Sequence, residues 1–287
     1  MFQAFDENYW GPKGRELMHQ YRDAQPFSHI SLAPFLVPEA AEMLVAEFPK
    51  VDDPIWNHYH HFNCHKMATN DREEFPEIVT QVIDELSSPK FVSWLSDLVD
   101  VPNLVPDPKL EGAGLHQING KGYLNIHADF TYHHHNNRLR RRVNLLLYLN
   151  QEWEDDWGGE LELWDEDVKR CVAKYPPLYN QAIIFSTSEN TWHGHPQPLN
   201  FPPGMGRKSI ALYYYTLEAE PGDRMRATLF RALPGTGMIA RLTMRLDQIA
   251  INIYTSVKQI FGIKNDNKVT IILKWIGKLI SRPTGRK

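Results

Sequence analysis

The chain has 287 residues, of which 42% are hydrophobic and 23% are charged. This length suits one large domain, or one domain with an appendage, and the composition is ordinary for a globular protein. It excludes a wholly disordered chain, a collagen-like repeat and, because Cys64 and Cys171 are the two cysteines, a small disulfide scaffold. The first residues lack the basic and apolar regions of a secretory signal, so we expect a cytoplasmic protein with reduced thiols.

The net charge of −4 conceals an asymmetry along the chain. Residues 224–287 contain 13 Lys and Arg against two acidic residues, a net charge of +11, which leaves −15 on the first 223 residues. The turn residues Pro221 and Gly222 lie near this change of sign. We therefore expect a main domain at residues 1–221 and a basic helical C-terminal extension at residues 222–287.

The N-terminal part, residues 1–111, is predicted to be mainly helical. Apolar residues recur at helical spacing, and Pro38 stands at a plausible first helical position. The predicted helices cover residues 13–23, 38–48, 77–86 and 90–99, and alternating residues predict a strand at 29–36. The segment His58–Phe62 is interpreted as a partly buried aromatic loop.

The pattern changes in the middle of the chain, at residues 112–216. Short runs rich in Val, Ile, Leu, Tyr and Phe alternate with Gly, Pro and Asn turns, which is typical of a β-sandwich or barrel. The predicted strands are 123–129, 142–149, 160–164, 171–175, 182–186 and 208–216. The fold class is therefore predicted to be mainly β with flanking helices (α+β), and a double-sheet jelly roll is the simplest architecture.

The C-terminal extension is predicted to form two amphipathic helices. The first carries one apolar stripe at intervals of three and four residues, with Arg241, Arg245 and Lys258 on its other faces. The stripe consists of Met238, Ile239, Leu242, Leu246, Ile249, Ile253, Val257, Ile260 and Phe261. The second would cover Val269–Ile280. Packing on the barrel or against a second subunit is one interpretation, and attachment to an anionic membrane is the other; nucleic-acid binding ranks below both.

The candidate chemistry lies in the predicted β region. His127 and Asp129 are two residues apart in a strand, so both side chains point to one face and can reach one metal ion. A third ligand would come from His193 or His195. Two histidines and a carboxylate leave open positions on an octahedral ion, an arrangement that points to non-heme Fe(II).

A basic residue enters the last predicted strand of this region. Arg207 and Ser209 share one face of that strand by the same period of two. An Arg inside an apolar barrel is costly unless it meets an anion, and a guanidinium suits a carboxylate. Arg207 is therefore a candidate carboxylate ligand, with Ser209 as a helper.

These segments resemble a known family. The series HADF, RRVNLLLYLNQEWEDDWGGELELW, FSTSENTWHGHPQPL and GRKSIALYYYT is similar to the Fe(II)/2-oxoglutarate-dependent dioxygenases, specifically their prolyl-4-hydroxylase-like branch, over about residues 112–216. The resemblance implies a double-stranded β-helix, a jelly-roll or cupin-like core. It further implies that Fe(II) and 2-oxoglutarate bind, that O2 is consumed, and that ascorbate supports the activity.

The resemblance also assigns roles by position. His127, Asp129 and His193 match the iron ligands, with His193 preferred to His195, and Arg207 matches the residue that holds the distal carboxylate of 2-oxoglutarate. The other matched pocket residues are Tyr148, which bonds the same carboxylate, Leu161, an apolar wall, and Tyr123, a pocket tyrosine, with Ser209 as helper. Segments before the barrel can form a lid in this family, which makes residues 50–75 a candidate lid.

Three functions remain open at this level. The first is hydroxylation of a prolyl residue in a protein or peptide, with release of succinate and CO2. The second is the same chemistry on a small metabolite, lipid or glycan, and the third is a non-catalytic jelly-roll binding protein. Outside the family motifs, His133–His135 is expected to be a solvated or substrate-flanking loop, and His116 either points into the pocket or is a hydrogen-bonded core residue.

Overall fold

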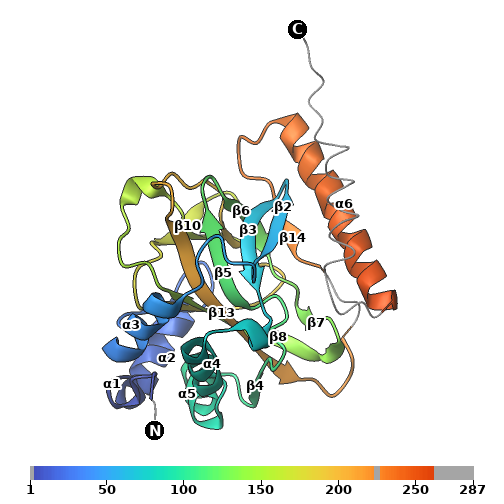
Figure 1. Ribbon diagram of the computed structural model, residues 1–287. Coiled ribbons are helices and arrows are strands. Elements are labelled where there is room, and N and C mark those ends of the chain that lie inside the picture. Colours follow the sequence, from blue (N-terminus) through green and yellow to red (C-terminus); the bar gives the residue numbers. More distant parts are fainter. Residues whose placement is uncertain (1–2, 223–226, 262–287) are drawn as a thin grey trace.

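The computed structural model describes residues 3–222 and 227–261, and a large antiparallel sheet dominates it (Figure 1). Its strands run in the order β1-β11-β8-β13-β5-β3-β6-β12-β9-β10, with β2, β4, β7 and β14 pairing alongside. In chain order the strands are β1 (His29–Leu32), β2 (Asn57–His61), β3 (Cys64–Thr69), β4 (Leu104–Pro106), β5 (Gly114–Asn119), β6 (Tyr123–Ala128), β7 (Tyr132–His133), β8 (Asn136–Tyr148), β9 (Leu161–Trp164), β10 (Cys171–Tyr175), β11 (Gln181–Ser186), β12 (His193–His195), β13 (Gly206–Leu217) and β14 (Leu229–Phe230).

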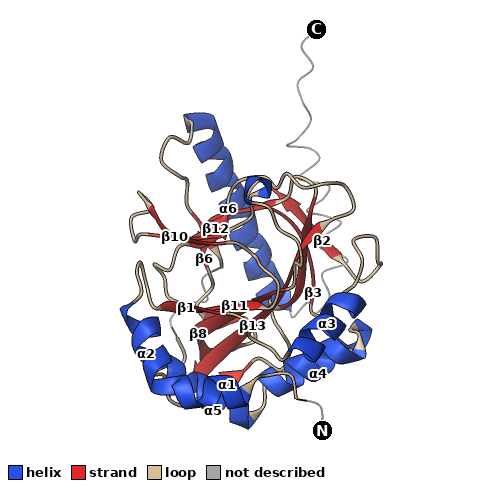
Figure 2. Ribbon diagram, turned by 90° about the vertical axis from the view of Figure 1, so that its left-hand side faces the viewer, coloured by secondary structure: helices blue, strands red, loops and turns tan. Residues whose placement is uncertain are grey.

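The sheet folds back on itself to make two facing layers. Figure 2 shows β1, β11, β8 and β13 in one layer and β6, β12 and β10 in the layer opposite. Strands β5 and β3 connect the layers at one side, because β5 pairs with β13 and β3 pairs with both β5 and β6. The predicted jelly-roll fold with flanking helices is confirmed.

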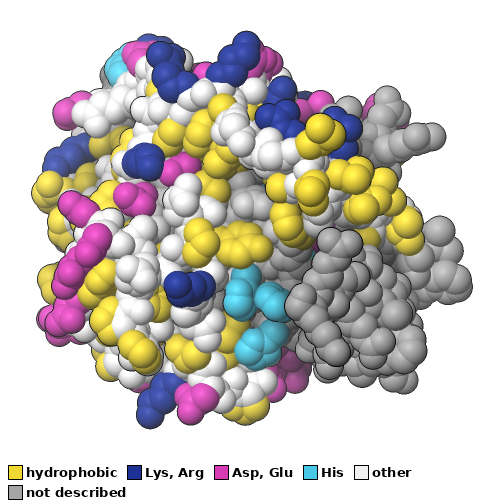
Figure 3. Space-filling model, turned by 90° about the horizontal axis from the view of Figure 1, so that it is seen from above, with side chains coloured by type: hydrophobic (Ala, Val, Ile, Leu, Met, Phe, Trp, Pro, Cys, Tyr) yellow, Lys and Arg dark blue, Asp and Glu magenta, His cyan; other side chains and the backbone are white. Residues whose placement is uncertain are grey.

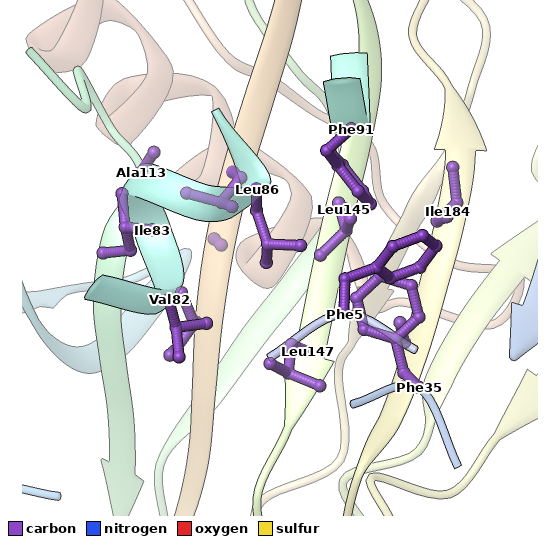
Figure 4. Packing of buried hydrophobic residues seen from close by; sticks show 14 of the residues in the cluster. Phe5, Phe35, Val82, Ile83, Leu86, Phe91, Ala113, Leu145, Leu147 and Ile184 are labelled. Carbon is purple, nitrogen blue, oxygen red and sulfur yellow. The ribbon is translucent and has the colours of Figure 1, made fainter. Parts of the chain in front are cut away.

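Helices from the N-terminal part cover the outer face of the first layer (Figure 2). They are α1 (Glu7–Trp10), α2 (Gly14–Asp23), α3 (Pro38–Glu47), α4 (Glu77–Leu86) and α5 (Pro89–Val99), with short 3-10 turns at Gly11–Lys13 and Arg72–Glu74. A further 3-10 turn, Asp155–Trp157, lies between β8 and β9. Figure 4 shows Leu86 and Phe91 from these helices packing toward Leu145, Leu147 and Ile184 of the sheet. This core fixes the layer that carries β8 and β13.

The sequence explains where these helices begin and end. In α5 the hydroxyl of Ser88 accepts a hydrogen bond from the Phe91 amide, and Pro89 occupies the first turn, where its missing N–H costs nothing. The helix stops at Asp100, which has a left-handed backbone with φ of 54°. The predicted helices at 13–23, 38–48, 77–86 and 90–99 are therefore all present, within a few residues at each end.

Several strands differ from their predicted bounds. The strand predicted at 29–36 ends at Leu32, because Pro34 has no N–H to donate to the ladder. Strand β8 begins at Asn136, earlier than the predicted Arg142, because its polar start still pairs with β13 and β7. The first residues of β8 therefore form a strand because their backbone is paired, and not because they follow an apolar pattern.

The segment 50–75 is not the loop that the sequence suggested. Strands β2 and β3 form a hairpin in which His60 lies opposite His65, and β3 joins the main sheet. The interpretation of His58–Phe62 as an aromatic loop was wrong, since pairing with β3 holds most of it as a strand whose side chains are largely exposed. The N-terminal part therefore supplies strands β1 to β4 as well as its helices.

The C-terminal extension contributes one strand and one long helix. Strand β14 pairs with β6, and α6 (Met238–Phe261) lies at the side of the barrel in Figure 1, which confirms the first predicted amphipathic helix. The second predicted helix, Val269–Ile280, lies outside the described residues. Among residues 3–222 and 227–261, no helix combines the length and apolar character needed to cross a membrane.

Candidate metal centre and anion pocket

Two neighbouring strands bring the candidate metal ligands together. His127 lies near the end of β6, Asp129 follows that strand, and His193 begins β12 directly opposite His127 in the antiparallel register. The Nε2 atom of His127 is 3.6 Å from Asp129 Oδ1, and Nε2 of His193 is 3.4 Å from Asp129 Oδ2. The three ligand atoms lie within 4.8 Å of one another, and no other such group occurs in the described part of the chain.

Backbone carbonyls orient both imidazoles for a metal. Nδ1 of His127 is 2.9 Å from the Asn125 carbonyl oxygen, and Nδ1 of His193 is 3.0 Å from that of Thr191. A carbonyl can only accept a hydrogen bond, so each Nδ1 carries the proton and each Nε2 presents a lone pair toward Asp129.

Burial keeps both rings neutral. It lowers the pKa of His127 to about 3, together with repulsion from His193 and against the attraction of Asp129. Burial also lowers the pKa of His193, again against Asp129. Neutral imidazoles with free Nε2 atoms and a carboxylate form a donor set that suits a divalent transition metal, so these residues fit the ion that the family resemblance implies.

Asp129 is held as a carboxylate by two buried neighbours. Nη2 of Arg141 donates to Asp129 Oδ2 at 2.9 Å, and Nδ2 of Asn144 donates to the same oxygen at 2.7 Å. Burial raises the pKa of Asp129, but the charge of Arg141 and the hydrogen bond from Asn144 lower it by more, so the net pKa is well below the ordinary value.

Arg141 is a site residue that was not among those predicted from the sequence. Its side chain has no solvent exposure, its Nε donates to Asn144 Oδ1 at 2.7 Å, and its guanidinium stacks 3.3 Å from the Tyr213 ring centre. The signal was present, because Arg141 precedes the apolar run of β8 and a buried guanidinium needs an anion. Arg141 could therefore have been predicted on the same ground as Arg207, namely that a guanidinium inside an apolar barrel needs an anion.

Arg207 lies at the start of β13, in the layer opposite the strands β6 and β12 that carry the histidine ligands, and its side chain is buried. Its Nε donates to the Gly159 carbonyl at 2.7 Å and its Nη2 donates to the Tyr148 hydroxyl at 3.1 Å. Within the described residues no carboxylate forms an ion pair with it. A buried guanidinium that has neutral partners and no acid makes an anion pocket.

Packing connects this anion pocket to the triad. Tyr148 belongs to a buried cluster with Leu161 and Phe185, and the Phe185 ring lies 4.7 Å from the His193 ring between centres. Ser209 is buried and lies opposite Tyr148 in the pairing of β13 with β8. The structure therefore brings Arg207, Tyr148, Leu161 and Ser209 to one interior.

Tyr123 is placed elsewhere. Its hydroxyl donates to the Phe62 carbonyl at 3.1 Å, and its side chain lines a surface pocket with Pro196 and Met244. Tyr123 therefore lies outside the predicted pocket. It is four residues before His127, at the end of β6 that faces the hairpin of β2 and β3 and helix α6.

Buried polar atoms without partners also mark the interior. Among the described residues, no hydrogen-bond partner reaches His116 Nε2, Gln117 Oε1 or either ring nitrogen of His195. Burial lowers the pKa of His195 well below its ordinary value, and the charge of Arg207 lowers it further. Such atoms in a native protein call for a bound group that supplies hydrogen bonds. His195 is therefore in the interior but outside the three-residue group, which contains His193.

The adjacent histidines 133–135 differ in exposure, since His135 is exposed whereas His133 is not solvated. His133 is buried, and its Nε2 lies 3.5 Å from Asp107 Oδ1 and 3.4 Å from Glu111 Oε2. His134 and His135 approach the other oxygen of Glu111 at 3.1 Å and 3.6 Å. The expectation of a solvated loop was wrong for His133, because the carboxylates of Asp107 and Glu111, which precede it in the chain, lie against its ring.

Comparison with known proteins finds a similarity to the same family in the same region. Residues 113–215 match the family model of the 2OG-Fe(II) oxygenase superfamily. A stretch of 79 residues is 32% identical to the mouse (Mus musculus) protein Prolyl 3-hydroxylase OGFOD1 and covers 26% of this chain. That stretch spans only 14% of the mouse protein's length.

Two solved structures are similar in fold. A prolyl-4-hydroxylase from Pseudomonas putida has a TM-score of 0.50 at 17% identity, covering 70% of this chain and 98% of that one. A prolyl hydroxylase from Trichoplax adhaerens, solved with a hypoxia inducible factor peptide fragment, has a TM-score of 0.49 at 16% identity, covering 72% and 91%. The first similarity agrees with the jelly-roll architecture.

Proposed function

We propose that this chain, in which residues 113–215 form a 2OG-Fe(II) oxygenase domain, is an Fe(II)- and 2-oxoglutarate-dependent hydroxylase that acts on an unactivated C–H bond and releases succinate and CO2. One observation carries the proposal. The neutral imidazoles of His127 and His193 and the ionised carboxylate of Asp129 face the same barrel interior as the buried Arg207, which has no acidic partner among the described residues. The triad suits a divalent metal ion, and the nearby Arg207 suits one carboxylate of a dicarboxylate that also reaches the metal.

The protein's own residues have clear tasks in this reaction. His127, Asp129 and His193 would hold the iron, which when bound supplies the oxygen-activating chemistry. Arg207 and the Tyr148 hydroxyl would hold the distal carboxylate of 2-oxoglutarate, for which the planar guanidinium fork is suited. Leu161 and Phe185 belong to the buried apolar cluster beside Tyr148 and would exclude water from this part of the interior.

We further propose that the substrate is a prolyl residue of a protein or peptide. The support is the names of the relatives, since the matched mouse protein is called a prolyl 3-hydroxylase.

The class of chemistry is tested by succinate release from 2-oxoglutarate with Fe(II) and ascorbate. We expect turnover in the wild type and none in His127→Ala or Asp129→Ala. His135→Ala is the matched control, because His135 is a 41% exposed histidine outside the triad. Turnover that survives both triad substitutions would refute the proposed metal site.

The substrate is tested by mass spectrometry of proline-containing peptides after incubation. We expect a mass gain of one oxygen atom on proline, absent without 2-oxoglutarate. If no such peptide stimulates succinate release but a sugar or lipid does, the prolyl part of the proposal is wrong while the hydroxylase part stands.

A further inference from the structure

Helix α6 has one side that is firmly attached to the barrel. Asp247 Oδ2 accepts hydrogen bonds from His61 Nδ1 at 2.8 Å and from Asn63 Nδ2 at 2.6 Å. Gln248 accepts from the Phe230 amide at 2.9 Å and donates to the Thr228 carbonyl at 2.8 Å. Met244, on the same side, is buried. These contacts fix how the helix is rotated about its axis.

The opposite side of α6 is apolar and exposed. Ile239, Leu242, Leu246, Ile249 and Ile253 follow one another at intervals of three and four residues, which places them in one stripe facing away from Met244. Their exposed fractions are 84%, 58%, 54%, 54% and 60%, and Met238 beside them is 86% exposed. The side chains of Val257, Ile260 and Phe261, which the sequence added to this stripe, lie outside the described ones.

Figure 3 shows this surface from above. Hydrophobic side chains gather at the side of the view where α6 lies in Figure 1, with Lys and Arg side chains beside them. A contiguous apolar surface of this kind on a folded domain marks an interaction site. The described part of α6 packs on the barrel, as one of the two interpretations expected, but through Met244, Asp247 and Gln248 and not through this stripe.

The charge beside the stripe indicates the partner. Arg241 and Arg245 are exposed and lie along one edge of the stripe. Asp247 is the acidic residue of α6, and it is on the barrel side, paired with His61. The sequence from 224 to 287 carries a net charge of +11. The partner should therefore be both apolar and anionic.

A second copy of the chain fits these requirements poorly. Pairing two α6 stripes would bring two segments of +11 together, and the like charges would repel. A nucleic acid offers phosphates but nothing to cover five aliphatic side chains. An anionic lipid bilayer offers both, because its headgroups attract basic residues and its acyl boundary accepts an apolar helix face.

We propose that α6 binds the surface of an anionic lipid bilayer. The helix lies flat, with Leu242, Leu246 and Ile249 entering the boundary between headgroups and acyl chains and Arg241 and Arg245 contacting lipid phosphates. The barrel is then held at the membrane surface by the Asp247 and Gln248 contacts. This binding requires neither iron nor 2-oxoglutarate, so it stands or falls independently of the proposed reaction.

The experiment is flotation of the full chain with vesicles, without iron or 2-oxoglutarate. We expect the wild type to float with phosphatidylcholine vesicles that contain phosphatidylglycerol and to remain behind with pure phosphatidylcholine. High salt should weaken the binding, because screening reduces the attraction of exposed charges. Equal flotation with both vesicle types would refute the role of charge.

Two variants test the stripe against a matched surface residue. Leu242→Ser should weaken vesicle binding by about tenfold, because one buried aliphatic side chain is lost. Leu217→Ser is the control, since Leu217 is also 58% exposed but lies at the end of β13. Far-UV circular dichroism establishes that both variants are folded. If both bind vesicles as the wild type does, the proposal is wrong.

A second pair of variants tests the basic edge. Arg241→Gln with Arg245→Gln should weaken binding to anionic vesicles by about thirtyfold, and Lys at both positions should restore most of it, because the surface potential acts on point charges. Sedimentation without lipid completes the test. A wild-type dimer that Leu242→Ser converts to a monomer would show that a second copy covers the stripe, and would overturn the proposal.

Discussion

Arg141 and Asp129 form a buried ion pair in which Nη2 lies 2.9 Å from Oδ2. Asn144 donates to the same oxygen, so Oδ2 already accepts two hydrogen bonds. Oδ1 accepts none from the described residues and lies 3.6 Å from His127 Nε2. The pair therefore fixes which carboxylate oxygen is open to a metal. Arg141, on strand β8, therefore acts as a positioning residue for the metal centre.

Replacing Arg141 should damage both stability and metal binding. Arg141→Met leaves the buried Asp129 carboxylate without its cation, and we expect a loss of about 3–5 kcal/mol in the free energy of unfolding. Arg141→Lys keeps the charge but cannot reach Asp129 and Asn144 together, so its loss should be smaller. Thermal melts with and without Fe(II) measure both effects.

Arg142→Met is the control for this prediction. Arg142 is the next residue along β8, but its side chain is 30% exposed and pairs with Glu218 at the surface. We expect a loss of no more than about 1 kcal/mol and an unchanged shift of the melting temperature by metal. If Arg141→Met behaves like Arg142→Met, the buried pair does not position Asp129.

The two histidines of β12 should differ sharply. His193→Ala removes a member of the triad, and we expect metal affinity to fall by at least about a hundredfold, which is the scale of losing a ligand or its orienting partner. His195→Ala should leave metal affinity nearly intact. Titration of the apoprotein with Co(II), followed by its visible absorption, distinguishes them. The reverse order would make His195 the third ligand.

Arg207→Lys should separate cosubstrate binding from metal binding. A point charge replaces a planar fork, so the bonds to Gly159 and Tyr148 and the bidentate grip on a carboxylate cannot all be kept. We expect 2-oxoglutarate affinity to fall by about tenfold or more while Co(II) affinity is unchanged. Calorimetric titration measures both, and unchanged 2-oxoglutarate affinity would identify a different anchor.

The sequence predicted the parts of this protein that local patterns encode. The spacing of His127 and Asp129 and the family motif around Trp192-His193 were sufficient to place the triad, and helical periodicity located α4 and α6. Residues that depend on distant partners could not be found in this way. Asn144 binds Asp129 only because β8 lies near the end of β6, and His133 is buried only because Asp107 and Glu111 reach it.

The hairpin of β2 and β3 illustrates the same limit. Neither strand alternates apolar and polar residues, since β2 is mostly exposed and both strands carry histidines. Their conformation comes from pairing with each other and with β5 and β6, and pairing partners leave no local signature. Packing of α6 on the barrel was one of the expected interpretations, but the residues that attach it, His61 and Asn63 of this hairpin, could not be predicted for the same reason.

A close approach of two strands makes Gly114 sensitive to substitution. Its φ is +95°, and a Cβ there would lie 2.4 Å from the Thr69 carbonyl oxygen. We expect Gly114→Ala to cost about 2–4 kcal/mol of unfolding free energy, from backbone strain and from displacement of β3. Gly204→Ala is the matched control, with φ of +88° and nothing within 4 Å. Urea unfolding of both variants gives the loss of unfolding free energy that is due to the close contact with Thr69. Equal losses would mean that β3 can move away from the new methyl group without a loss of stability.

The attachment of α6 should depend on pH through His61. Burial lowers the pKa of His61, but the hydrogen bond to Asp247 and the contact with Cys64 outweigh it and raise the pKa to about 9. A folded-state pKa above the unfolded value of 6.5 contributes stability that is complete below that value and is lost as the pH rises through about 9. We therefore expect the amides of α6 to exchange faster, relative to their intrinsic rates, at pH values above 9 than near neutrality.

Asp247→Asn tests the cause of that dependence. Asparagine keeps a hydrogen-bonding oxygen but removes the charge that holds His61 protonated, so the free-energy difference between wild type and variant should be large at about pH 6 and small at about pH 10. Asp167→Asn is the control, because Asp167 pairs with Lys169 at a surface where both side chains are largely exposed, and should have little effect at either pH. A wild-type advantage over Asp247→Asn that is the same at both pH values would mean that the charge of His61 does not hold the helix. In that case Gln248, through its bonds to Phe230 and Thr228, would be the main attachment of α6.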